Sequence, residues 1–202
     1  MVYLQTTPYT TAASSLINIL EMINTDYEGC VDDEFDIWLN SALLPTRASS
    51  IFGLGLVAKR KKIEPFIIVE SEEYDFPDYR FYRYKKKDVD YAKISSDLYK
   101  KKAKKTKIPC EVKSIDLDLI KELLKNNYLI VRLNVKDIRG LKSNSSNYLV
   151  FKKYEEDVFT IIDPMQGELQ IKEETVKSCL ETLEVKKRRA RKLIGFKRKL
   201  DY

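Results

Sequence analysis

Apolar residues in the first third of the chain recur at the 3.6-residue spacing of amphipathic helices. The spacing predicts a helix that begins at Thr10 or Thr11 and runs to about Asn24. A second helix is expected to open at the acidic run 32–34 and to end at Pro45, with Phe35, Trp38, Leu39 and Leu43 turned inward. A third helix should cover residues 51–61, where Gly53 and Gly55 serve as close packing points.

The later part of the chain alternates helix patterns with short apolar runs of strand type. Helices are predicted over residues 88–105, 116–126 and 172–182, and the first of these should use Val89, Ala92, Ile94, Leu98 and Tyr99 as contacts. Strands are predicted at 65–70, 108–112, 128–135 and 169–171. Alternation at 148–150 and 158–162, across a polar turn at 152–157, predicts a hairpin that ends at Asp163-Pro164. Helices come first and strands later, so we expect a single α+β domain with an antiparallel sheet.

Composition narrows the function classes. The 202 residues include three cysteines and no histidine. Cys30, Cys110 and Cys179 lie far apart, which argues against a disulfide framework and against a zinc site. No glycine-rich phosphate-binding pattern is present. We therefore expect no cofactor and no metal. No stretch reaches the length of a membrane span, and no signal core opens the chain, so a cytoplasmic protein is expected. Abundant Lys, Ile, Glu and Tyr hint at a thermophilic source.

Two separated stretches, residues 4–16 and 147–164, carry a resemblance. They resemble the papain-like cysteine peptidases of family thirty-nine, which cut bacteriocin leader peptides, and especially the stand-alone relatives of those enzymes. The region around 36–60 extends the similarity. The resemblance implies a papain-like fold, with Gln5 at the oxyanion position and Asp163 as the third catalytic member. It also places Thr11 at the nucleophile position and Asn147 where the catalytic His belongs.

The resemblance implies a pseudoenzyme. A hydroxyl such as that of Thr11 is scarcely ionised near neutral pH, and Asn147 cannot accept and return a proton. Ala12-Ala13 also replaces the Gly-Pro of the active relatives. The leading hypothesis is a non-catalytic module that binds a protein or peptide in the vestigial cleft lined by Gln5, Thr11, Asn147 and Asp163. The alternative is that these four residues form a polar cluster that fills a dead cleft.

A second hypothesis comes from the charge distribution. The net charge is +6, and it concentrates near the C-terminal end of the chain. Basic and aromatic residues also interleave over 79–85, which would suit base stacking, or a strand with one aromatic face and one charged face. The alternative function is therefore RNA or ribosome association, with these possible polyanion-binding residues: Arg80, Arg83, Lys85, Lys86, Lys87, Lys186, Lys187, Arg188, Arg189 and Arg191.

Two further expectations concern the C-terminal strand and a possible acidic site. Leu193, Ile194 and Phe196 should form a closing strand over 191–197, with Lys192 and Lys197 in water, while 186–189 and 198–199 project as a basic patch. An enzyme that uses an unrelated acidic site, at 32–34 or 72–73, is the third hypothesis. Those acids are also typical of a helix start and a turn.

Overall fold

The computed structural model describes residues 2–75 and 84–199. Its helices are α1 Thr11–Ile23, α2 Val31–Leu39, α3 Ile51–Arg60, α4 Lys86–Lys105, α5 Leu117–Leu124 and α6 Glu173–Val185. Its strands are β1 Ala42–Leu43, β2 Ala48–Ser49, β3 Pro65–Val69, β4 Cys110–Val112, β5 Asn127–Asn134, β6 Ser146–Glu155, β7 Val158–Asp163, β8 Gly167–Lys172 and β9 Lys192–Lys197. The predicted α+β class is confirmed.

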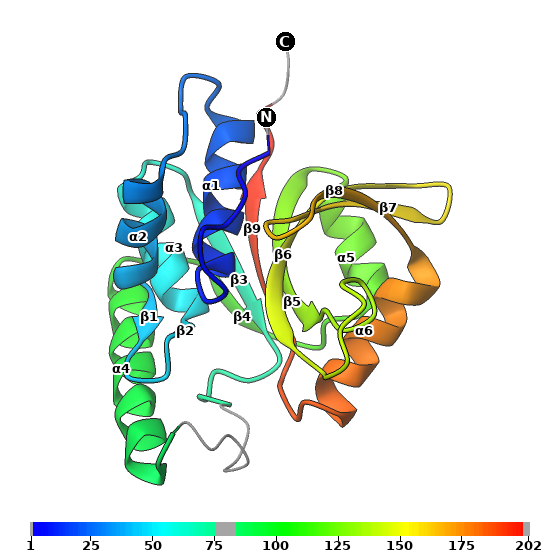
Figure 1. Cartoon of the computed structure of the whole chain (residues 1–202). Helices are drawn as coiled ribbons and strands as arrows, with labels where there is room; N and C mark the ends of the chain where they lie inside the picture. The colour runs from blue at the N-terminus through cyan, green and yellow to red at the C-terminus, as the bar shows by residue number, and fades with distance from the viewer. Residues whose placement is uncertain (1, 76–83, 200–202) are drawn as a thin grey trace.

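A seven-stranded sheet, in the order β4-β3-β9-β5-β6-β7-β8, forms the centre of the molecule (Figure 1). All of its neighbouring strands are antiparallel except β3 and β4. The hairpin of β6 and β7 turns at Glu156-Asp157, and both residues have positive φ, as a tight hairpin turn requires. The predicted hairpin is therefore confirmed, with a tighter turn than the polar run 152–157 suggested.

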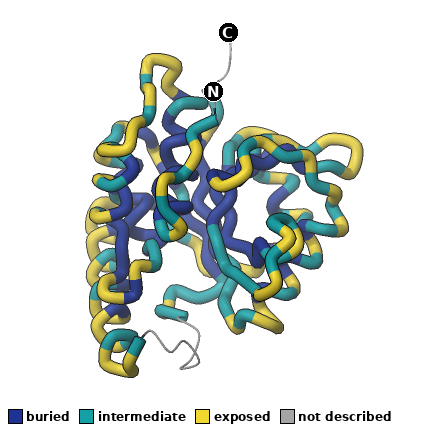
Figure 2. Tube along the Cα trace, in the orientation of Figure 1, coloured by how far each residue is buried: buried dark blue, intermediate teal, exposed yellow. Residues whose placement is uncertain are grey.

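Helices cover both faces of the sheet. Alternate residues of each strand point to opposite sides, so each strand contributes to both packing layers. Ile130 of β5 packs with α1, α2 and α3 on one face. Its neighbours Leu129 and Val131 pack with α5 and α6 on the other. Figure 1 shows these two helix groups on opposite sides of the sheet, and Figure 2 shows the most buried segments between them.

The helices follow the predicted pattern with local corrections. Ser50 caps α3 by accepting a hydrogen bond from the Gly53 N–H at 3.3 Å. A Cβ added at Gly53 would lie 2.8 Å from the Cα of Ser41, so the close packing predicted there is confirmed. However, α2 ends at Leu39, well before Pro45. Leu39 is also exposed, because the chain leaves the helix there and Ile37 supplies the buried contact instead.

Two further corrections concern α4 and β9. Ile94 and Leu98 of α4 are exposed, and Ala92 and Ser96 face the body of the protein in their place. The predicted closing strand is β9, but it lies in the middle of the sheet, between β3 and β5. Because it is central, Lys192 is buried rather than in water. The interleaved segment 79–85 lies outside the described residues except for Tyr84 and Lys85.

Candidate functional site: a cleft between α1 and β6

The N-terminal segment, residues 2–10, is fixed beside α1 and the end of β7. The backbone N–H of Gln5 donates to the carbonyl of Pro164 at 2.8 Å. Asn18 of α1 exchanges hydrogen bonds with the backbone of Tyr3 at 3.0 and 2.9 Å. The fully buried carboxylate of Glu34 accepts from the Thr6 N–H at 3.0 Å and from the Tyr3 hydroxyl. Together these contacts hold Gln5 next to the start of α1.

Thr11 is the first residue of α1, and its buried hydroxyl donates to Oε1 of Gln5 at 2.7 Å. One helical turn later, the Ser15 hydroxyl donates to the carbonyl of Tyr148 at 2.9 Å. Residues four apart share one helix face, so this bond turns the Thr11 face of α1 toward β6. Thr10 occupies the N-cap position but makes no side-chain capping bond. Its hydroxyl donates to the Thr7 carbonyl instead.

Asn147 of β6 lies on the other side of the same opening. Its Nδ2 donates to the Ser145 hydroxyl at 3.5 Å, which is the outer limit of a hydrogen bond. Thr11 and Asn147 both line a cleft of about 500 Å³. The structure thus brings together the two positions that the resemblance paired across most of the chain. The other lining residues are Pro8, Tyr9, Ala12, Thr46, Arg47, Ala48, Ser49, Tyr84, Arg132, Ser145, Ser146, Tyr148, Lys187 and Arg189.

Asp163 is fully buried and has a different partner. Both of its oxygens accept from the Arg139 guanidinium, at 2.7 and 2.6 Å, and Oδ1 also accepts from the Met165 N–H at 2.9 Å. A buried carboxylate requires such donors. Arg139 is the main donor that satisfies it. Asp163 and Gln5 are not among the lining residues of the cleft, so of the four predicted cleft residues only Thr11 and Asn147 line it.

The comparison with protein families agrees with this geometry. A family model described as a Peptidase_C39-like family matches residues 1–200. The chain belongs to the Peptidase_C39-like family. The α+β architecture described above is accordingly papain-like. A search of the curated proteins found no match.

The cleft presents no group of the family's usual catalytic chemistry among its described lining residues. Those residues include no cysteine, and the chain has no histidine. Cys110 and Cys179 lie on β4 and α6, away from the cleft, and Cys30 precedes α2. Burial raises the pKa of the Cys179 thiol to about 12, and burial also raises that of Cys110. These two thiols are therefore protonated near neutral pH, unlike a nucleophilic thiolate.

A buried charge cluster under the cleft was missed by the sequence interpretation. Arg132 of β5 donates to Asp75 and to the carbonyl of Ala190, and Arg189 and Lys192 lie 3.9 and 3.8 Å from Oδ1 of Asp75. Burial favours the neutral carboxyl, but the three cations outweigh it and hold the pKa of Asp75 far below its usual range. An Arg within the apolar run 128–135 was the available signal, because a buried guanidinium needs a carboxylate partner.

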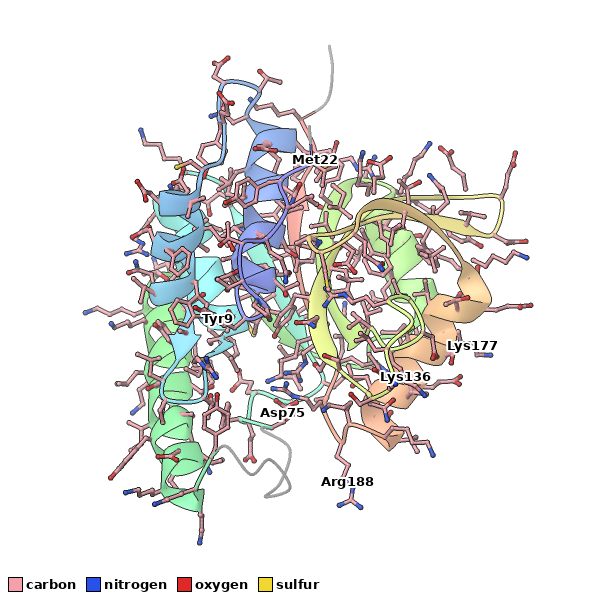
Figure 3. All side chains as sticks on the ribbon, viewed as in Figure 1. Tyr9, Met22, Asp75, Lys136, Lys177 and Arg188 are labelled. Atoms are coloured by element: carbon pink, nitrogen blue, oxygen red, sulfur yellow. The ribbon has the colours of Figure 1, made fainter. Side chains whose placement is uncertain are left out.

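The predicted polyanion-binding residues divide into four groups. Arg80 and Arg83 lie outside the described residues. Exposed positions are held by Lys85, Lys86, Lys87, Lys186 and Arg188, and Figure 3 shows Arg188 pointing away from the body of the protein. Lys187 is half-buried and lines the cleft.

Arg189 was expected to project as part of the basic patch, which is wrong. Arg191, a possible polyanion-binding residue expected at the start of the closing strand, is also held by groups of the protein. The side chain of Arg189 is 13% exposed and lies next to Asp75. Arg191 pairs with Glu70 at 3.5 Å and with Glu184 at 3.1 Å. Arg198 was also expected to project, yet it donates to the carbonyls of Leu124 and Asn127. These arginines hold the C-terminal region against the rest of the protein. Each one binds carboxylates or backbone carbonyls that need a donor when they are buried.

The described residues also bear on metal sites and membrane spans. Within residues 2–75 and 84–199, no group of three or more His, Cys, Asp or Glu side chains is arranged to hold a metal ion. No helix in that part of the chain is long and apolar enough to cross a membrane.

Proposed function

We propose that this chain is a non-catalytic member of its family that binds a protein or peptide in the cleft between α1 and β6. The observation that carries the proposal is the cleft itself, which retains an opening of about 500 Å³ with Thr11 and Asn147 at its wall. A cleft of this volume lies within the range of ligand-binding pockets. An open cleft at these positions favours a binding role over a polar cluster that fills a dead site.

The loss of chemistry is supported by the partners of the four family positions. The Thr11 hydroxyl donates a hydrogen bond to Oε1 of Gln5, so it is engaged by an amide oxygen and not by a group that acts as a base. Asp163 is saturated by Arg139 and does not orient a base. Loss of nucleophile and base together removes on the order of a millionfold in turnover where both have been deleted.

The first test measures hydrolysis of a broad peptide library by the native chain and by Thr11→Ala. We expect no turnover with either protein. Turnover that disappears in Thr11→Ala would show that the hydroxyl is a working nucleophile and would contradict the proposal.

The second test measures retention of short peptides by the native chain and by Ala48→Trp, which places a large ring in the cleft wall. Thr25→Trp adds the same ring at an exposed turn and is the matched control. We expect retention by the native chain and by Thr25→Trp, and its loss in Ala48→Trp. Equal retention by all three proteins would place binding elsewhere.

The alternative proposal is that the chain associates with RNA or the ribosome. The exposed Lys85, Lys86, Lys87, Lys186 and Arg188 favour it. Phosphate contacts make such binding strongly salt-dependent. RNA retention that falls steeply with salt, and that Ala48→Trp leaves unchanged, would favour this alternative over cleft binding.

A further inference from the structure

The charged side chains among the described lining residues of the cleft are all cationic. Its described lining residues include Arg47, Arg132, Lys187 and Arg189, and none of them is an Asp or Glu. We propose that the peptides held in this cleft are acidic, and that their Asp and Glu carboxylates are bound by the cationic wall. The inference rests on the proposed cleft-binding function and specifies its ligand class.

Among the described residues, the carboxylate that pairs with this wall is Asp75. Asp75 lies in the segment after β3, where it faces Arg132, Arg189 and Lys192 at the same time. Three cations share one carboxylate, which leaves positive charge in excess among these four groups. Lys187 and Arg189 already interact with other groups of the protein, so the inference rests on this local charge and not on unused donors.

The cations also disfavour one another's charge. Burial lowers the pKa of Lys187, and the neighbouring Arg189 lowers it further. Burial and the charge of Arg132 act in the same direction on the pKa of Arg189. A carboxylate bound in the cleft would raise the pKa of Lys187 and of Arg189 again, because an opposite charge nearby favours the charged form of a cation.

Helix α1 adds to the positive potential at the same wall. Its first turn contains no acidic residue, and the N-cap side chain of Thr10 does not satisfy its free N–H groups. A helix N-terminus carries partial positive charge and favours anions. Thr11 and Ala12, the first two residues of α1, both line the cleft, so this end of the helix lies at the same opening as the four cations.

The remaining surface of the cleft suits a peptide better than a free inorganic anion. Tyr9, Tyr84 and Tyr148 contribute rings to the wall. The Arg47 guanidinium lies 5.3 Å from the ring centre of Tyr9, and its Nε is 3.4 Å from the Tyr84 hydroxyl. Arg47 is thereby held at the cleft edge, where a carboxylate could approach it. Aromatic rings can pack against apolar side chains while guanidinium groups bind carboxylates. The cleft therefore favours peptides that contain both acidic and apolar residues.

The test uses a random library of short synthetic peptides and compares the acidic content of the retained and input pools. The cleft variant is Arg47→Gln with Lys187→Gln, which removes two lining charges. The matched control is Lys186→Gln with Arg188→Gln, which removes two exposed charges beside the same loop that do not line the cleft. Arg47→Gln alone changes an exposed side chain and serves if the double variant folds poorly.

We expect the native chain to enrich Asp and Glu by roughly threefold, as weakly screened ion pairs permit. The enrichment should persist in the control variant and approach unity in the cleft variant. Retained peptides with ordinary acidic content would overturn this inference and leave the proposed function standing. Equal loss of enrichment in both double variants would assign it to general surface charge and overturn the inference as well. Absence of any retained peptide would overturn the proposed function and the inference together.

Discussion

Thr11 and Asp163 stand at two positions that the resemblance assigns to catalysis, and each is hydrogen-bonded to another side chain of the protein. The Thr11 hydroxyl remains at the start of α1, but it is a donor to Gln5. The Asp163 carboxylate remains at the end of β7, but Arg139 takes both of its oxygens. Each group is satisfied within the protein. Under the proposed function, these residues maintain the structure around the site and take no part in proton transfer.

The Arg139–Asp163 pair leads to a prediction about stability. Arg139→Met would leave a fully buried carboxylate without its main donor, and breaking one side of such a pair costs about 3–5 kcal/mol. We expect that loss in the free energy of unfolding measured with urea. Lys142→Met, an exposed change in the loop that follows, should stay within about 0.5 kcal/mol.

The double variant Arg139→Met with Asp163→Asn checks the mechanism. Removal of the charge should recover part of the stability lost in Arg139→Met, because the remaining amide is cheaper to bury than an ion. The single variant Asp163→Asn completes the comparison. If the losses of the two single variants simply add in the double variant, then the pair is not coupled and the interpretation is wrong.

At the scale of elements, the approach of α3 to the β1 region depends on a missing side chain. A Cβ at Gly53 would lie 2.8 Å from the backbone of Ser41, whereas a Cβ at Gly55 would lie 3.1 Å from the flexible tip of Ile67. Both glycines are inside the same helix, so Ala would improve the helix propensity of each by about 1 kcal/mol.

We predict that these two substitutions differ because of that packing. Gly53→Ala should destabilise the protein by about 1–3 kcal/mol, the usual range for overpacking, since backbone must move. Gly55→Ala should be close to neutral, because a side-chain tip can shift. Thermal unfolding of the two variants is the measurement, and equal midpoints would show that the Ser41 contact relaxes freely.

Helix and strand positions were largely predictable from sequence, because local spacing specifies them. The pattern of residues 16–23 suffices for α1, and the apolar run 128–135 corresponds to β5. Which face of α4 is buried was not predictable from sequence. Its Ile94 and Leu98 have the spacing of a buried stripe but are exposed, whereas Ala92 and Ser96 are buried. The buried positions hold small residues, and periodicity alone does not show that these residues face the body of the protein in place of the larger apolar ones.

The candidate site was predictable only where the resemblance covered it. Thr11 and Asn147 do line one cleft, but the partners that define its charge come from elsewhere. Asp75 and Arg132 are 57 residues apart, and Arg189 reaches them through the connection into β9. The order of strands decides these contacts, and the central place of β9 is a tertiary property that local spacing does not encode.

At the scale of the whole molecule, the buried charge cluster under the cleft should make stability depend on pH. Burial, reinforced by Arg132 and Arg189 and opposed by Asp75, lowers the pKa of Lys192 to about 8. An unfolded lysine titrates near 10.4. Between these values the unfolded chain binds a proton that the folded chain lacks. The contribution of Lys192 to the free energy of unfolding therefore rises as pH increases through this window.

We predict that the native chain gains stability relative to Lys192→Met by on the order of 1–2 kcal/mol between about pH 7.5 and 9.5. The difference between the two proteins isolates Lys192, because opposing terms such as Tyr74, whose pKa burial raises to about 12, are common to both. Lys197→Met, at the exposed end of the same strand, is the matched control and should run parallel to the native chain. Urea unfolding at several pH values supplies the measurement. Parallel curves for the native chain and Lys192→Met would mean that Lys192 titrates as an exposed lysine, and the charge cluster beneath the cleft would then be more open to water than its burial indicates.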